Sequence, residues 1–189
     1  FTWLSYPYYQ YYIDPDAVSY LTLTDRYLAQ DYNQAINAFW SPMGVWLTVL
    51  MVKCTDWQHF AAALFVNTVA AFGVVLLAQY LFHKFIKENW ERLCFGLMSA
   101  FFWTTTIYRQ SFTDLWQVFF LLLALLILLR KDFLSKAYWW VILGLVAALS
   151  FFSKAFSFYF MPLMTLIVVL MKMKQNGAVK LPRLLSITA

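Results

Sequence analysis

Five long apolar runs, separated by short charged connections, constrain this chain more than any other feature. The runs are Trp57 to Phe82, Leu93 to Tyr108, Leu115 to Leu129, Tyr138 to Ser153 and Phe156 to Met171. A helix needs about 20 apolar residues to cross a bilayer, so several runs must extend into their flanks. The chain is 63% hydrophobic and 12% charged, with a mean hydropathy of +0.64, which is far more apolar than a soluble domain. We therefore predict an all-α, polytopic helical membrane protein.

The basic residues indicate which ends of the runs share a side of the membrane. Three groups hold ten of the 14 Lys and Arg residues: Lys84, Lys87 and Arg92; Arg130, Lys131 and Lys136; and Lys172, Lys174, Lys180 and Arg183. Each group follows an alternate run, as the positive-inside rule requires of cytoplasmic connections. They are not a patch with interleaved aromatics, so we expect no nucleic-acid partner.

Most acidic residues fall on the other side of this topology. Asp14, Asp16, Asp25, Asp31 and Asp56 precede the first run, and Asp114 follows the second. Acidic residues do little to set topology, so their gathering indicates a site at the outer face. We predict that residues 1–56 form an external loop with juxtamembrane helices and that residues 57–189 form a transmembrane region of about five spans. The chain starts without Met and stops after another hydrophobic segment, so we expect it to be part of a longer protein.

Two short interfacial helices are expected in the external loop. The first is predicted to lie on the membrane with Asp16 just before its first turn, because apolar-face residues recur at helical spacing: Ala17, Tyr20, Leu21, Thr24, Tyr27 and Leu28. There Asp16 can cap free backbone N–H groups, which is a purely structural alternative to a catalytic role. Ser41-Pro42 marks a second helix start, and this helix, ending near Cys54, is too short to span.

Three further charged residues on the outer side have both structural and functional interpretations. Lys154 lies between two apolar runs, where an ammonium is costly unless it snorkels to the headgroups or meets an anion. Arg109 is either an interfacial anchor or a second phosphate ligand. Asp114 begins a span and either caps it, with Thr113 as an equal candidate, or belongs to the site. Both readings stay open for each residue.

Several motifs, taken in order, resemble the GT-C membrane glycosyltransferases. They are Pro15-Asp16-Ala17-Val18-Ser19-Tyr20, Gln30-Asp31-Tyr32, Trp40-Ser41-Pro42 with Trp46, Thr113-Asp114-Leu115, and Ser153-Lys154-Ala155. The set is most similar to the family 39 and aminoarabinose-transferase-like branch, within the dolichyl-phosphate-mannose-protein mannosyltransferase superfamily. The chain has Trp40-Ser41 where the aminoarabinose transferases have Glu-Lys, and Gln30 where the family has glycine.

The resemblance implies an enzyme that transfers a sugar from a polyprenyl-phosphate donor to an acceptor hydroxyl, with inversion, at the outer face of a bacterial inner membrane. Asp16 takes the place of the family's general base, and Asp114 that of its second-loop aspartate. Asp14, Tyr20, Arg109 and Lys154 are assigned to substrate binding. No cofactor is certain, and a divalent metal ion shared by Asp16 and Asp114 is left open. The acceptor, whether protein, lipid or glycan, is not identified by the sequence.

Two other classes compete with this interpretation. A transporter or flippase for a lipid-linked saccharide would place ionisable groups near the bilayer midplane. The interiors of the runs offer only Asn67, Thr68, Gln79 and Gln117 as conspicuous polar groups, which disfavours transport. In a non-catalytic membrane scaffold, the external acids would only cap helices.

Overall fold

The computed structural model describes residues 15–36, 39–109 and 113–175, and this part of the chain is helical throughout, with no strand. Its α-helices are α2 (Pro15–Leu28), α3 (Tyr32–Ala35), α4 (Met43–Thr55), α5 (His59–Phe85), α6 (Asn89–Arg109), α7 (Asp114–Leu128), α8 (Ala137–Ser153) and α9 (Ser157–Gln175), and a 3-10 turn, η1 (Phe133–Ser135), precedes α8. The predicted all-α class is confirmed for these residues.

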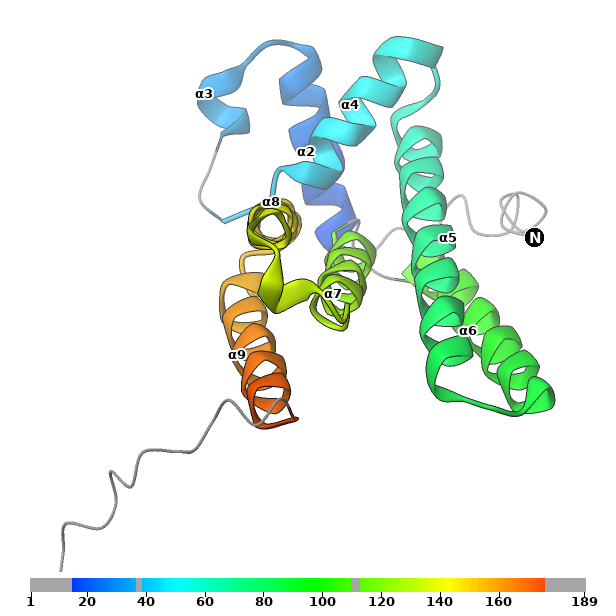
Figure 1. The fold of residues 1–189 in the computed structure, drawn as a ribbon. Coiled ribbons are helices and arrows are strands. Elements are labelled where there is room, and N and C mark those ends of the chain that lie inside the picture. The colour runs from blue at the N-terminus through cyan, green and yellow to red at the C-terminus, as the bar shows by residue number, and fades with distance from the viewer. Residues whose placement is uncertain (1–14, 37–38, 110–112, 176–189) are drawn as a thin grey trace, which may run out of the picture.

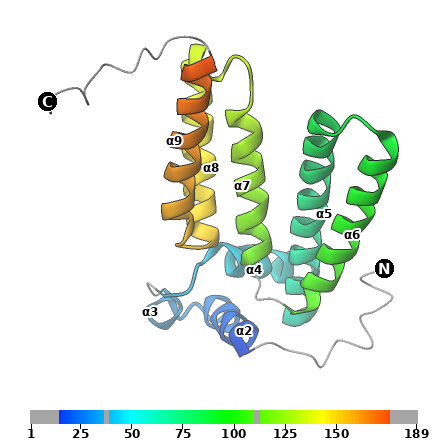
Figure 2. The ribbon, with the colours of Figure 1, turned by 90° about the horizontal axis from the view of Figure 1, so that it is seen from below.

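Helices α5 to α9 form the long body of the molecule, and α2, α3 and α4 lie across one end of it (Figures 1 and 2). Helices α5 and α6 form an antiparallel hairpin, and α7 lies between α5 and the pair formed by α8 and α9. As a result, the start of α7, the end of α8 and the start of α9 all meet α2 and α4 at the same end. We call this the outer end, and the opposite end the inner end.

Local sequence signals explain where the short helices begin and end. Helix α2 begins at Pro15, whose missing N–H costs nothing in a first turn, so Asp16 lies inside that turn rather than before it as predicted. Pro42 precedes the first residue of α4, close to the predicted start. Asp56 ends α4 in the left-handed conformation, with φ of 54°, which Asp and Asn tolerate better than most residues.

The main core is built around α7. Phe120, Ala124 and Leu128 are buried against α8 and α9, where they meet Val146 and Met161. Large apolar side chains elsewhere stay exposed on this single chain, above all on α6, α8 and α9. Examples are Trp90, Leu97, Met98, Phe101, Phe158, Leu163 and Leu170. Exposed apolar surface of this extent indicates contact with a membrane or with further protein.

Two of the described helices are long and apolar enough to cross a membrane: α5, with 27 residues, and residues Ser157–Lys174 of α9. Helices α7 and α8 are apolar but have only 15 and 17 residues, which corresponds to about 22–26 Å at 1.5 Å per residue. Helix α6 has 21 residues and a more polar composition, with Glu91 and Arg92 in its first turns. The five predicted runs are therefore five helices, of which two meet the criteria of length and composition for a span.

Candidate functional site

Asp114 and Lys154 form an ion pair at the outer end. Asp114 is the first residue of α7, and Lys154 follows the last residue of α8, so the pair joins two neighbouring helix ends. About a third of each side chain remains exposed, 28% for Asp114 and 33% for Lys154. Each charge also lies at the favourable end of its helix, the carboxylate at an N-terminus and the ammonium at a C-terminus. The predicted phosphate ligand Lys154 is thus held by a predicted site carboxylate.

Tyr20 links α2 to the start of α7. Its side chain is 7% exposed, its hydroxyl lies 3.4 Å from the Oγ1 atom of Thr113, and the ring of Trp40 packs edge-on against it with centroids 4.9 Å apart. Thr113 precedes α7 but makes no side-chain capping bond; its buried hydroxyl instead faces Tyr20. This contact joins α2 to the start of α7, next to Asp114.

The Tyr20 hydroxyl lies in the field of both predicted carboxylates. Burial raises the pKa of Tyr20 above its ordinary value, the bond with Thr113 lowers it, and the charges of Asp114 and then Asp16 raise it further. Asp16 is one helical turn before Tyr20 in α2, and Asp114 follows Thr113, which contacts the Tyr20 hydroxyl. This hydroxyl keeps its proton at neutral pH and remains a hydrogen-bond donor. The exposed Asp16 stands at the solvent side of the group.

The remaining predicted residues are only partly described. Asp14 lies outside the described residues. Arg109 is the last residue of α6, at the outer end, but its side chain is not among those described. No group of three or more His, Cys, Asp or Glu side chains suited to a metal ion occurs in the described ranges. A divalent ion on Asp114 would have to compete with the ammonium of Lys154.

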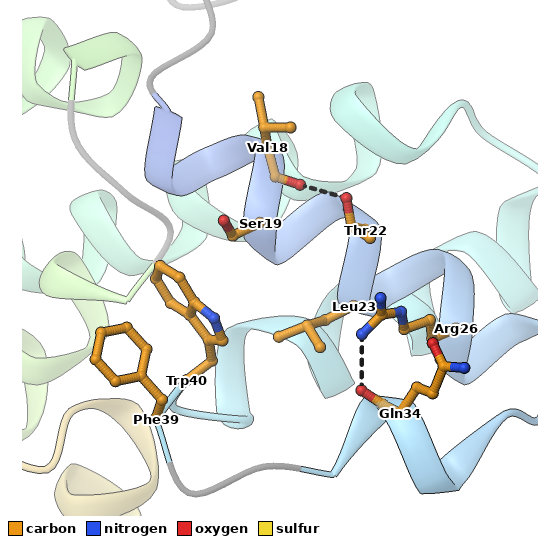
Figure 3. Close-up of a pocket in the computed structure, with 8 residues that line it drawn as sticks. All are labelled: Val18, Ser19, Thr22, Leu23, Arg26, Gln34, Phe39 and Trp40. Atoms are coloured by element: carbon orange, nitrogen blue, oxygen red, sulfur yellow. Dashed lines mark hydrogen bonds between the residues drawn. The ribbon is translucent and has the colours of Figure 1, made fainter.

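A groove about 470 Å³ in volume runs along α2, the helix that carries Asp16 in its first turn (Figure 3). We call it the α2 groove; its lining residues are Val18, Ser19, Thr22, Leu23, Arg26, Gln34, Phe39 and Trp40. The Nη1 atom of Arg26 donates a hydrogen bond to the carbonyl oxygen of Gln34 at 2.9 Å, and this bond fixes the guanidinium across the groove. Ser19 is one helical turn after Asp16, so the groove leads along one face of α2 toward that carboxylate.

A second cavity, of about 440 Å³, shares Leu23 and Trp40 with the α2 groove. It is lined mainly by apolar and aromatic side chains from α2, α3 and α4, among them Tyr27 and Trp46, and by Phe152 of α8. Phe152 is two residues before Lys154. The outer end therefore carries an ion pair, a groove of mixed polar and apolar lining, and an apolar cavity.

One contact at this end was missed by the sequence analysis. The Nδ1 atom of His59, the first residue of α5, lies 2.5 Å from a carboxylate oxygen of Asp25 on α2. Neither residue belongs to a motif, and no periodicity links them. The contact holds the second half of α2 to the start of α5.

Comparisons with known protein families, with curated proteins and with solved structures find no match to this chain. The resemblance to the GT-C enzymes therefore rests on the motifs alone.

Proposed function

We propose that this chain belongs to a multi-pass, GT-C-type glycosyltransferase that acts at the outer face of a bacterial plasma membrane. It would transfer a sugar from a polyprenyl-phosphate-linked donor to an acceptor hydroxyl. The observation that supports this most is the gathering of Asp16, Tyr20, Asp114 and Lys154, from three separate parts of the chain, at one end of the helices. The basic connections lie at the other end, as expected if that end is cytoplasmic.

In this proposal, Asp16 is the general base. Its carboxylate takes the proton of the acceptor hydroxyl while the hydroxyl oxygen attacks the anomeric carbon of the donor sugar. The bond from that carbon to the phosphate oxygen breaks, its electron pair leaves with the polyprenyl phosphate, and the configuration inverts. The exposure of Asp16 leaves it accessible to a substrate. The neutral Tyr20 hydroxyl can donate a hydrogen bond to a substrate oxygen beside it.

Lys154 would stabilise the departing phosphate. An ammonium has three N–H donors, and the bond to Asp114 occupies one of them, so two remain for phosphate oxygens. Asp114 acts here as a positioning residue that keeps the ammonium at the outer end. The apolar cavity that includes Phe152 provides space for the hydrocarbon of the carrier next to Lys154. No step is assigned to a metal ion.

The α2 groove is our candidate for the acceptor. Hydroxyl and amide groups from Ser19, Thr22 and Gln34 line it together with the rings of Phe39 and Trp40, a combination suited to a polar ligand with apolar faces. Arg26 adds a positive charge about three helical turns after Asp16. The reacting hydroxyl would lie at the Asp16 end of the groove.

The proposal is tested by sugar transfer from polyprenyl-phosphate donors in membranes that contain the full-length protein. Asp16→Asn should reduce the rate by about 10²–10⁴-fold, the contribution typical of a general base. Asp56→Asn is the matched control, because it removes the same charge at the same end and Asn tolerates the left-handed backbone of that position. Equal activity of both variants would refute the role of Asp16, and movement of the lipid-linked saccharide without transfer would favour the flippase alternative.

A further inference from the structure

The inner end gathers most of the positive charge of the described chain. Eight basic side chains lie in the α5–α6 connection, the α7–α8 connection and the flanking turns, against three acidic ones. The basic residues are Lys84, Lys87, Arg92, Arg130, Lys131, Lys136, Lys172 and Lys174, and the acidic ones are Glu88, Glu91 and Asp132. Figure 2 shows that these connections lie at the same end of the helices, opposite α2 and α4.

Two of these cations, from helices on either side of α7, converge on the end of that helix. The ammonium of Lys84, in the last turn of α5, donates a hydrogen bond to the carbonyl oxygen of Leu129 at 3.4 Å. The ammonium of Lys172, near the end of α9, donates to the next carbonyl oxygen, that of Arg130. The two like charges act on each other directly. Backbone carbonyls hold them in place without neutralising them.

Asp132 also acts on the Lys172 charge, with the opposite sign to Lys84, but its carboxylate is bonded to other partners. The Asp132 carboxylate accepts hydrogen bonds from the Nε atom of Arg130 and the Nε1 atom of Trp139, each at 3.2 Å, and pairs with Lys136 at 3.1 Å. Neither Glu88 nor Glu91 forms an ion pair with the two lysines. Within the described residues, neither Lys84 nor Lys172 has a carboxylate within ion-pair distance, and each keeps N–H donors for an external anion.

A partly exposed apolar stripe on α7 ends at the same point. Val118, Leu122, Leu125 and Leu129 recur at helical spacing and are all partly exposed, whereas Phe120 and Ala124, on the opposite face, are buried. Helices α5 and α9 flank α7 (Figures 1 and 2). The stripe leads from the two lysines toward the middle of the helix, which is the direction that an acyl chain takes from its headgroup.

We propose that Lys84 and Lys172 bind the phosphate of an acidic glycerophospholipid of the inner leaflet, with an acyl chain along the stripe on α7. The contact carbonyls fix the two ammonium groups as a pair, and a single phosphate relieves their mutual repulsion. This lipid site rests on the membrane placement proposed above and not on the transfer reaction. The lipid site and the glycosyltransferase activity can therefore fail independently of each other.

The test measures binding of phosphatidylglycerol to the purified full-length protein, by native mass spectrometry and by titration in detergent micelles. Phosphatidylcholine with the same acyl chains is the reference lipid. A Lys near an anionic membrane surface contributes about fivefold to binding, so Lys84→Gln combined with Lys172→Gln should weaken phosphatidylglycerol binding by about 25-fold. Lys84→Arg with Lys172→Arg keeps both charges and should retain the lipid.

The matched control is Lys131→Gln with Lys174→Gln, which removes the same charge from the same end. Both of these lysines are exposed and make no carbonyl contact in the described part of the chain. Equal losses in the two double variants would show diffuse attraction and overturn the site, as would equal binding of phosphatidylglycerol and phosphatidylcholine to the unmodified protein. Displacement of the lipid by millimolar inorganic phosphate would indicate a free-anion site instead. If Lys84→Gln with Lys172→Gln does not fold, the comparison is made with Lys84→Arg and Lys172→Arg. If that folded Arg variant loses as much phosphatidylglycerol binding as the control variant, the proposal is likewise overturned.

Discussion

Breaking the ion pair between Asp114 and Lys154 tests the candidate site most directly. Exposed ion pairs contribute about 0.2–1 kcal/mol, whereas removing one partner of a buried pair costs about 3–5 kcal/mol. These side chains are 28% and 33% exposed and thus fall between the two cases. We expect Asp114→Asn and Lys154→Gln each to lower the free energy of unfolding by about 1–2 kcal/mol. For a chain of this size, that corresponds to a fall in Tm of about 2–8 °C.

The assay is a double-mutant cycle on the full-length protein in one detergent at one heating rate. The double variant should be less destabilised than the sum of the two single variants, because it leaves no uncompensated charge. We expect a coupling energy of about 1 kcal/mol; a sum that is additive within about 0.3–0.5 kcal/mol would refute the pair. Transfer activity should stay low in the double variant, since the proposed phosphate ligand is gone. Recovery of stability without recovery of activity therefore separates the structural role of the pair from the role of Lys154 in binding.

Three further predictions concern single residues. Tyr20→Phe should cost about 0.5–1.5 kcal/mol, because the Thr113 hydroxyl loses its partner. The folded-state pKa of Tyr20 is raised above 10.0, so the neutral hydroxyl stabilises the fold fully below the unfolded pKa, and this stabilisation is lost as the pH rises through the folded pKa. Between about pH 8 and about pH 11, the Tm of the unmodified protein should therefore fall more steeply than that of Tyr20→Phe. Tyr32→Phe, at an exposed site, is the control and should fall as steeply as the unmodified protein. Hydrogen bonds from the indole N–H of Trp139 and, to a smaller extent, from Lys136 hold the pKa of Asp132 well below its usual range. The Asp132 carboxylate therefore stabilises the fold above the unfolded pKa of about 4, and this stabilisation is lost as the pH falls below it. The Tm values of the unmodified protein and of Asp132→Asn should converge on acidification. Asn67 is buried with neither amide atom bonded in the described structure, so Asn67→Leu should raise Tm, and a fall in Tm would show that the amide has a partner.

The helices could be predicted from the sequence because their signals are local. The apolar runs, the prolines at positions 15 and 42 and the charged connections all lie within a few residues of the boundaries that they determine. The apolar face of α2 was predicted at Ala17, Tyr20, Leu21, Thr24, Tyr27 and Leu28. Ala17, Tyr20 and Thr24 are buried, the other three are only partly buried, and the buried Leu23 was missed. Leu23 lies at the edge of that face and belongs to one buried cluster with Val45 of α4 and Ala63 of α5, which follow it in the chain. Periodicity within α2 carries no information about such neighbours.

The contacts within the site could not be predicted in the same way. Alternation of the runs placed Asp114 and Lys154 on one side, but their contact depends on α7 and α8 packing together with matched ends. Tyr20 and Thr113 are 93 residues apart, and their contact depends on how α2 crosses the ends of the longer helices. A rule for sidedness gives the membrane face of a residue, and only packing gives its neighbour.

The two ends of the molecule hold their lysines differently, and this bears on what each can bind. At the outer end a carboxylate accepts a hydrogen bond from the Lys154 ammonium, so the negative charge of Asp114 offsets part of the attraction between this ammonium and a phosphate. At the inner end carbonyl oxygens accept Lys84 and Lys172, and the full charge of both remains available. A phosphate should therefore bind more weakly at the outer end. Weaker binding suits a leaving group that must be released after each transfer, and stronger binding suits a resident lipid.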